Sequence, residues 1–360
     1  MSQATTPMQS GGSSSQTNIA TAETAMVVDT ASPTTDENDE VWEGDSGYND
    51  SLYETETSSV AEEVLRYREE NGRTYHNFGS TEYWGPNDVD AQEQQDLSHH
   101  FFTLALENEL FTAPIDNPQK ILDVGTGTGQ WVIDVAERFP TAQVKGIDLS
   151  PIQPEWHPIN AHFVVDDFNI PWEITSNYDL IHSRELLGSV LSWPTFLSEA
   201  FKALRPGGWM DCTEPDINCF SEIMEPRDDD PQIVWVRLFR EVSEKSGMTF
   251  EPAKELKRWM EEAGFVNVRE KVVTAPVGEW PTDEKRKFLG LSNQLRLDKG
   301  MRDFTERRMR NFMGWHDDEI AALIARTRAW VNDKDLHTVQ HMFVYLSLSN
   351  ILPFSSPCTP

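Results

Sequence analysis

An apolar run that ends in a glycine-rich turn is the part of this chain best suited to chemistry. Residues 121–131 read ILDVGTGTGQW, in which Asp123 precedes Gly125, Gly127 and Gly129. Glycine permits a tight turn and lets backbone amides approach a ligand closely. The spacing G-x-G-x-G differs from the G-x-G-x-x-G of dinucleotide-binding turns. We therefore expect this turn to bind a nucleoside with an amino-acid tail, with Asp123 orienting the loop or receiving an ammonium group through water.

Acidic residues end the next two apolar runs. Asp148 and Leu149 follow the run that ends in KGI, and Asp166, Asp167 and Phe168 follow the next one. An acid in the first position can accept hydrogen bonds from both ribose hydroxyls. A carboxylate in the second can bind an adenine amino group while the aromatic ring flanks the base. Taken alone, Asp148 or Asp166 could instead cap a helix, and the glycines could form any tight turn. The ordered set favours a ligand site.

These motifs lie in an alternation of expected strands and helices. We expect seven strands, over residues 120–124, 143–148, 162–165, 178–182, 209–213, 266–273 and 336–348. Helices are expected between them, including about sixty largely helical residues before the last strand. Strands separated by helices imply an α/β fold with a parallel sheet covered on both faces. Ligands of such sheets bind at the carboxyl ends of the strands.

The region before the first strand is expected to be helical. Helices are predicted over residues 59–75 and 90–111, with a polar and aromatic turn between them that contains Tyr83 and Trp84. About fifty residues in two helices form too small a core to stand alone. We expect residues 61–117 to rest on the sheet domain as a lid, with Tyr83 and Trp84 facing the ligand. The alternative for the turn is a packing role.

Charge is distributed unevenly along the 360 residues. Eleven of the 60 acidic residues lie within residues 1–60, and the first basic residue is Arg66. We expect this acidic, Ser/Thr-rich segment to be a disordered tail, because it has little apolar area to bury. The acidic surplus of the rest disfavours direct nucleic-acid binding. The short basic run RRMR, residues 307–310, is interpreted as a solvated helix face.

Composition also limits the compartment. The three cysteines, Cys212, Cys219 and Cys358, form no disulfide framework, and no apolar run is long enough to cross a membrane. We expect a protein of the cytosol or nucleus. The expected domains are the tail (1–60), the lid (61–117), a sheet domain (118–350) and a C-terminal tail (351–360).

In order, the motifs ILDVGTGTGQW, GIDLS, VDDFN, YDLIHSREL and LRPGGW resemble the class I S-adenosylmethionine-dependent methyltransferases over residues 119–213. Residues 70–100, ENGRTYHNFGSTEYWGPNDVDAQEQQDLSHH, are similar to the LaeA-like group of fungal methyltransferases, in which a helical region precedes the core. The resemblance implies a Rossmann-like sheet of seven strands with the last antiparallel, and S-adenosylmethionine as cofactor. It also implies a role in secondary metabolism, as a tailoring enzyme or as a nuclear regulator partnered with velvet-type proteins.

Methyl transfer is an in-line displacement that depends on positioning and water exclusion more than on acid–base catalysis. His182 and Glu214, at the ends of the fourth and fifth strands, are the candidate bases. Alternatively, His182 supports the backbone or contacts the cofactor, and Glu214 is structural. Arg184 could hold a substrate carboxylate or pair locally. No cluster has metal-ligand spacing, so we expect metal-free catalysis.

The motifs and the family resemblance together leave two alternative functions. The leading hypothesis is a methyltransferase for a small-molecule secondary metabolite, by O-, N- or carboxyl methylation. The alternative is a LaeA-like nuclear regulator that acts through protein partners, with weak or self-directed methylation. An NAD-dependent oxidoreductase is disfavoured by the glycine spacing.

Overall fold

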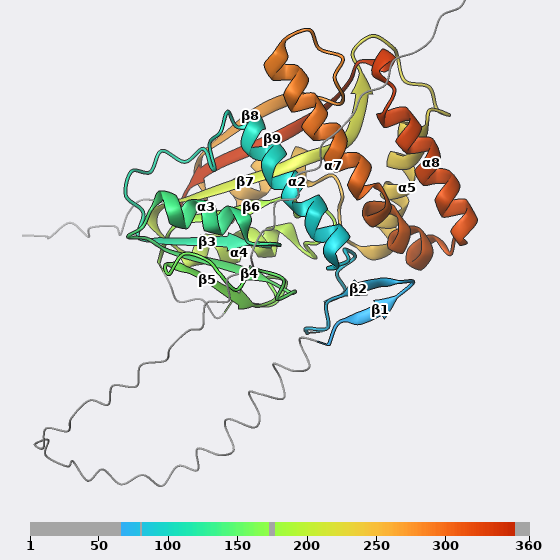
Figure 1. Ribbon diagram of the computed structural model, residues 1–360. Helices are drawn as coiled ribbons and strands as arrows, with labels where there is room; N and C mark the ends of the chain where they lie inside the picture. The colour runs from blue at the N-terminus through green and yellow to red at the C-terminus, as the bar shows by residue number, and fades with distance from the viewer. Residues whose placement is uncertain (1–65, 80, 173–176, 350–360) are drawn as a thin grey trace, which may run out of the picture. The chain divides into compact units, whose positions relative to one another are not determined.

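A seven-stranded sheet organises the computed structural model, which describes residues 66–79, 81–172 and 177–349 (Figure 1). The expected tails, 1–60 and 351–360, lie outside these described residues. The strands are β3 (Lys120–Val124), β4 (Gln143–Asp148), β5 (Ala161–Val165), β6 (Tyr178–Arg184), β7 (Leu204–Ser221), β8 (Val266–Pro276) and β9 (Thr338–Leu348).

The strand order is β5-β4-β3-β6-β7-β9-β8. Neighbours from β5 to β7 run parallel, whereas β9 lies between β7 and β8 and is antiparallel to both. The expected mostly parallel sheet with an antiparallel last strand is therefore confirmed. All seven expected strands are present, and β7 and β8 continue beyond their predicted ends.

Helices cover both faces of the sheet. They are α2 (Val89–Ala105), α3 (Gln130–Arg138), α4 (Trp193–Ala203), α5 (Pro231–Ser246), α6 (Leu256–Ala263), α7 (Glu284–Arg308) and α8 (Asp317–Val331). Alternate residues of a strand face opposite sides. Thus Leu122 packs with α4 and α6, whereas Ile121 packs with α3 on the other face. On that second face α2 lies alongside α7 (Figure 1), and Phe101 and Phe102 of α2 are fully buried against β8 and β9.

The expected helix over residues 59–75 is wrong in its described part. Residues 68–75 form a hairpin of β1 (Arg68–Glu70) and β2 (Arg73–Tyr75). Asn71 and Gly72, between the strands, both have positive φ, as a two-residue hairpin turn requires.

The next helix also ends earlier than expected. Asp88 caps α2 by accepting a hydrogen bond from the amide of Ala91, but the helix stops at Ala105 and not at residue 111. Glu107 and Asn108 adopt left-handed backbone conformations that cannot continue a right-handed helix. The N-terminal region therefore combines a hairpin, an extended segment and one helix.

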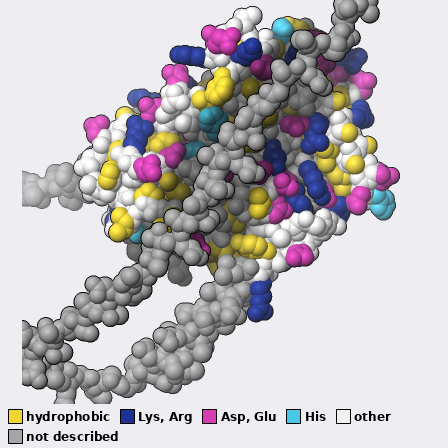
Figure 2. Space-filling view, viewed as in Figure 1, with side chains coloured by type: hydrophobic (Ala, Val, Ile, Leu, Met, Phe, Trp, Pro, Cys, Tyr) yellow, Lys and Arg dark blue, Asp and Glu magenta, His cyan; other side chains and the backbone are white. Residues whose placement is uncertain are grey.

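The helical insertion before the last strand is confirmed. It consists of α7, a π-helical turn (Met309–Met313) and α8, and it packs beside α5. Figure 2 shows acidic and basic side chains intermixed over the described part of one face. That face therefore offers no uniform basic surface for a phosphate backbone.

Candidate functional site

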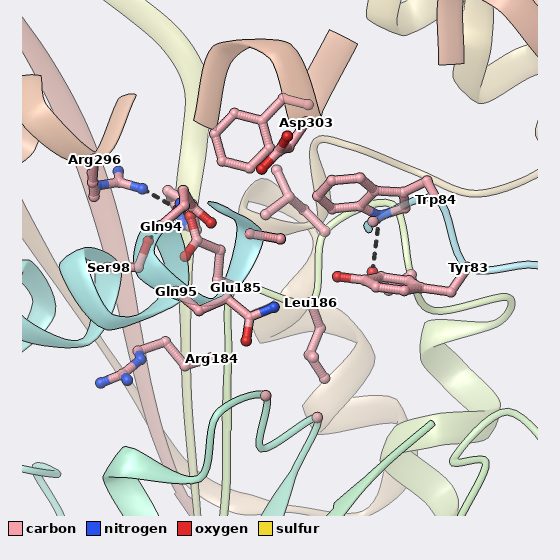
Figure 3. Close-up of a pocket in the computed structure, with 18 of the residues that line it drawn as sticks. Tyr83, Trp84, Gln94, Gln95, Ser98, Arg184, Glu185, Leu186, Arg296 and Asp303 are labelled. Carbon is pink, nitrogen blue, oxygen red and sulfur yellow. Dashed lines mark hydrogen bonds and ion pairs between the residues drawn. The ribbon is translucent and has the colours of Figure 1, made fainter. Parts of the chain in front are cut away.

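A cavity lies where the carboxyl ends of β3, β4 and β6 meet (Figure 3). The glycine turn and the loops after β4 and β6 form one side. The segment 81–87 and helices α2, α5 and α7 supply the remaining walls. The cavity therefore lies at the sheet edge predicted from the strand order, and it is walled by segments from distant parts of the sequence.

The glycine turn has the geometry that its sequence predicts. Gly125, Gly127 and Gly129 have φ of 72°, 56° and 79°. A Cβ added at Gly125 would lie 2.5 Å from Leu186, and one at Gly127 would lie 2.6 Å from Oε1 of Gln95. The left-handed backbone conformation therefore favours glycine at all three positions, and a Cβ at Gly125 or Gly127 would also displace the end of a neighbouring side chain. Gly125 and Gly127 line the cavity, whereas Gly129 caps α3.

Asp148 holds this turn in place. Its Oδ2 accepts a hydrogen bond of 2.9 Å from the amide of Gly127, and its Oδ1 accepts one of 3.0 Å from the amide of Ser150. Burial raises the pKa of the carboxyl. Asp148 and Leu149 both line the cavity, at the end of β4 where a ribose-binding acid was predicted.

The residues after β5 separate into two environments. Phe168 lines the cavity. The carboxylate of Asp167 accepts hydrogen bonds from the hydroxyl of Thr81 and from the amide of Asn169, and Asp166 accepts one from the amide of Asp167. Neither aspartate is among the residues that line the cavity, so the adenine contact predicted for them stays a prediction.

His182 is fixed by two neighbours. It pairs in register with Asp123 across β3 and β6, and its Nδ1 lies 2.7 Å from Oδ1 of Asp123. Its ring stacks on Trp131, with centroids 3.9 Å apart and planes at 5°. All three residues line the cavity. Asp123 occupies Nδ1, which leaves Nε2 as the ring nitrogen that a ligand could use.

Arg184 belongs to a buried polar chain. Its Nη2 lies 3.0 Å from Nδ1 of His99, whose Nε2 lies 2.9 Å from Oδ2 of Asp134. Burial lowers the pKa of His99. A neutral His99 that donates to Asp134 and accepts from Arg184 satisfies both contacts. Arg184 also lies over the ring of Phe102, so it lines the cavity with its head group already positioned.

Glu214 has a different position from the one expected for a catalytic base. It is fully buried, and its two oxygens accept hydrogen bonds of 2.9 and 3.0 Å from the amides of Leu186 and Leu187. It is not among the cavity-lining residues. The preceding residue of that loop, Glu185, has a φ of +58°, which is costly for a residue other than glycine. Glu214 thus holds a strained loop and does not reach the cavity.

Tyr83 and Trp84 line the cavity opposite the glycine turn (Figure 3). Nε1 of Trp84 donates to the hydroxyl of Ser189 over 3.2 Å, and the carbonyl oxygen of Tyr83 accepts a hydrogen bond from Arg307. The two rings lie 5.1 Å apart. This segment therefore connects the loop after β6 to α7 beside the cavity, and its role as a lid stays a prediction.

Several lining residues were not predicted from the sequence. Gln95 of α2 meets the glycine turn, and its Oε1 is buried with no hydrogen-bond partner among the described residues. Arg296 of α7 bonds to Glu185 over 2.8 Å. The interpretation of residues 307–310 as a solvated helix face is wrong for Arg307 and Arg308, which are 7% and 3% exposed. Their surroundings come from the hairpin and α5, which local sequence does not reveal.

Two further findings concern the described residues as a whole. They contain no group of three or more His, Cys, Asp or Glu side chains arranged to hold a metal ion. No helix among them is both long and apolar enough to cross a membrane.

Comparison with known proteins agrees with this geometry. A family model described as a methyltransferase domain matches residues 97–270, which include the second half of α2, the glycine turn and the strands from β3 to β7. The chain is 36% identical over 284 residues to "Methyltransferase pytC" of Aspergillus terreus, covering 78% of this chain and 88% of that protein.

Similar matches extend to a second set of fungal proteins. The chain is 34% identical to "Secondary metabolism regulator laeA" of Monascus pilosus, covering 77% of this chain and 76% of that protein. It is 31% identical to "Protein-methionine methyltransferase laeA" of Emericella nidulans, covering 78% and 76%. The matches thus include methyltransferases and regulators.

Proposed function

Because the chain belongs to the class I S-adenosylmethionine-dependent methyltransferases and resembles LaeA within them, we propose that it methylates a small-molecule secondary metabolite. The cofactor would bind at the glycine turn, and the acceptor would bind in the part of the cavity enclosed by the lid and the helical insertion.

The residues at the turn fit this cofactor. Positive φ and close neighbours at Gly125 and Gly127 keep the turn free of side chains, so that a ligand can reach the backbone. The orphaned Oε1 of Gln95 is a buried acceptor beside this turn, suited to the ammonium group of the methionine tail. Asp148 would accept the ribose hydroxyls, and Phe168 would flank the base.

One observation supports the small-molecule acceptor. The cavity that is lined by the glycine turn is also lined by the aromatic rings of Trp84, Trp235, Phe239, Phe250 and Phe304. Apolar and aromatic walls with a few polar groups are typical of small-molecule sites. An extended protein segment would instead need backbone partners along an open groove or sheet edge.

The cofactor supplies an electrophilic methyl group, and the residues of this chain have to position the acceptor and exclude water. Tyr83 and Trp84 would close the cavity above the glycine turn. Nε2 of His182 is available to hold or accept a proton, because Asp123 engages the other nitrogen. Glu214 would act only through the loop that it fixes.

Binding is the first test. Gly127→Arg should abolish binding of S-adenosylmethionine in calorimetry, because the side chain would fill the space needed by the methionine tail. Gly247→Arg is the matched control, since Gly247 also has a positive φ but meets no atom within 4 Å. Wild-type affinity in a folded Gly127→Arg protein, or tighter binding of NAD than of S-adenosylmethionine, would contradict the proposal.

A second candidate is a nuclear regulator with velvet-type protein partners and self-directed methylation. The names of the laeA relatives support it, one as a regulator of secondary metabolism and one as a protein-methionine methyltransferase. Intact-protein mass spectrometry after incubation with S-adenosylmethionine distinguishes the two functions. A mass gain of the protein itself, with no modified small molecule, would favour the regulator.

A further inference from the structure

Arg308, the last residue of α7, places a cationic group in the wall of the cavity. It is 3% exposed. Its guanidinium carbon lies 3.5 Å from the ring centroid of Trp84, 4.3 Å from that of Phe250 and 5.2 Å from that of Phe239. The cation is therefore surrounded by aromatic rings that come from the lid, α5 and the loop after α5.

The hydrogen-bonding capacity of this guanidinium is largely unused. Nη1 donates to the carbonyl oxygen of Phe304 over 2.7 Å. Nε is buried and has no hydrogen-bond partner among the described residues. No carboxylate among the described residues forms an ion pair with Arg308.

Other buried arginines have partners. Arg296 bonds to Glu185, Gln340 and Asn293, although it also lies over two phenylalanine rings. Arg184, the third arginine of the cavity wall, contacts Nδ1 of His99, and burial lowers its pKa against the attraction of acids such as Asp123. Of the three arginines that line the cavity, Arg308 is therefore the one whose guanidinium has no polar side chain as a partner among the described residues.

The acidic side chains that line the same cavity have other hydrogen-bond or ion-pair partners. The five acids have these partners: Asp123 contacts His182, Asp148 accepts two backbone amides, Glu185 pairs with Arg296, Asp216 accepts from Asn218, and Asp303 pairs with Arg73. None of these carboxylates can turn to Arg308 without leaving a buried partner unpaired. The missing anion therefore has to come from outside the described residues.

A buried charge without a counter-ion is costly to fold. Burial accordingly lowers the pKa of Arg308 well below its ordinary value. The α-helix also changes to a π-helical turn directly after Arg308, and such turns occur often at functional sites. The unpaired buried charge and the π-helical turn both indicate that Arg308 serves to bind a ligand and not to stabilise the fold.

We propose that Arg308 binds a carboxylate of the methyl acceptor, whose apolar, planar body packs among Trp84, Phe239 and Phe250. This inference rests on the proposed function and narrows its substrate class to aromatic or conjugated acids. The carboxylate is the anchor and not the methylated atom, because a guanidinium that neutralises an oxygen makes it a poorer nucleophile. The methyl group would go to another oxygen or nitrogen of the same molecule.

The carboxylate of the cofactor is the competing source of an anion. Trp84, which stacks on Arg308, lies across the cavity from Gln95, which meets the glycine turn (Figure 3). The methionine tail belongs beside the turn, and Arg184 lies on that side. The acceptor is therefore the favoured source, and cofactor affinity is measured in the same variants to decide between them.

The test compares carboxylates with neutral isosteres. Full-length protein, with and without saturating S-adenosylhomocysteine, is titrated calorimetrically with benzoate and naphthalene-2-carboxylate, each against its carboxamide. Wild-type protein should bind at least one carboxylate about ten- to a hundredfold more tightly than its carboxamide, as expected for hydrogen bonds to a charged group. Arg308→Met should lose this preference and retain its affinity for S-adenosylhomocysteine. Arg310→Met, whose arginine pairs with Glu306 and Asp317, should behave as wild type.

Stability provides a second measurement. Since Arg308 lacks a counter-ion, Arg308→Met should melt at the wild-type temperature or above it. A melting temperature several degrees lower would show a structural role and overturn the proposal. The proposal would also be overturned if wild-type protein bound each carboxylate and its carboxamide equally, or bound neither of them. Weaker binding of S-adenosylhomocysteine by Arg308→Met would assign the anion to the cofactor instead. Failure of wild type to bind S-adenosylhomocysteine would contradict the proposed function, while the titrations without cofactor still decide the role of Arg308.

Discussion

Glu214 lies inside β7 with both carboxylate oxygens on backbone amides of the loop after β6. Burial, the largest influence, raises its pKa, the two amides lower it and the nearby Glu185 raises it, and together they bring the pKa to about 8. An unfolded glutamate releases its proton near its ordinary pKa, whereas the folded protein keeps it up to about pH 8. The unfolded state therefore binds fewer protons in this window, so the free energy of unfolding falls as the pH rises.

Glu214→Gln should remove this dependence. Between about pH 5 and pH 8, the free energy of unfolding of wild type should fall relative to that of the variant. The reason is that only wild type has a buried carboxyl whose pKa is higher in the folded than in the unfolded state. Chemical denaturation at several pH values measures the difference in free energy of unfolding. Glu225→Gln, at an exposed position, should show no such trend. A constant difference between Glu214→Gln and wild type would refute the assignment.

Asp148 combines two roles, since it holds the glycine turn and lies where the ribose should bind. We expect Asp148→Ala to weaken binding of S-adenosylhomocysteine by about 1.5–3 kcal/mol, the range for hydrogen bonds to a charged group. The melting temperature should also fall, because the amides of Gly127 and Ser150 lose their acceptor. Calorimetry and thermal melting check both effects, with exposed Asp116→Ala as the control. Unchanged affinity would remove Asp148 from the site.

The sequence predicts that residues at the strand ends lie close together, and the structure places them in the lining of one cavity, while their roles stay predictions. Asp123, Gly125, Gly127 and Asp148 lie directly after apolar runs, and the edge of a parallel sheet brings such positions together. The prediction for Arg308 was wrong, because the run RRMR has the spacing of a solvated helix face. Burial of Arg308 depends on rings contributed by the lid and α5, which are distant in sequence.

At the level of elements, the hairpin β1–β2 was the main error. The dipeptide Asn71-Gly72 is a strong signal for a two-residue hairpin turn, whereas the apolar spacing of the preceding residues predicts a helix. The sheet strands were predicted well because their apolar runs are bounded by turns and helices. The early end of α2 had no comparable signal, since Glu107 and Asn108 are not typical helix terminators.

The hairpin is attached to the insertion by buried ion pairs. Arg73 of β2 bonds to Asp88 and to the buried Asp303 of α7. Arg73→Leu would leave Asp303 buried without a partner, so we expect a loss of about 3–5 kcal/mol in the free energy of unfolding. Arg68→Leu, whose partner Glu82 is exposed, should cost about 0–1 kcal/mol. Similar losses in urea denaturation for both variants would contradict the proposed attachment of the lid.

The ring of Tyr83 tests the lid itself. Tyr83→Ala keeps the backbone carbonyl that accepts from Arg307, so only the ring is lost. If the ring excludes water from the reacting groups, we expect kcat to fall about ten- to a hundredfold, with cofactor affinity nearly unchanged. Phe288→Ala, at an exposed ring of α7, is the matched control. Equal kinetics for Tyr83→Ala and wild type would refute the lid.

For the molecule as a whole, the strand number and the antiparallel last strand could be predicted, since both follow from motif order and family resemblance. The set of segments that forms the walls of the cavity could not be predicted. The walls combine the segment 81–87, the sheet edge, α5 and α7, and no periodicity reveals that residues more than two hundred positions apart, such as Trp84 and Arg308, meet in one cavity wall. The site is therefore a property of the assembled fold.

The central claim is that this protein transfers a methyl group from S-adenosylmethionine to a small molecule bound in this cavity. The most direct measurement incubates the full-length protein with S-adenosylmethionine carrying a labelled methyl group and a metabolite extract from a strain that lacks the protein. Mass spectrometry then follows the label in the small-molecule and protein fractions. We predict label in a small organic acid, dependent on wild-type protein and absent with Gly127→Arg. Label found only on protein, or equal labelling with Gly127→Arg, would contradict the account.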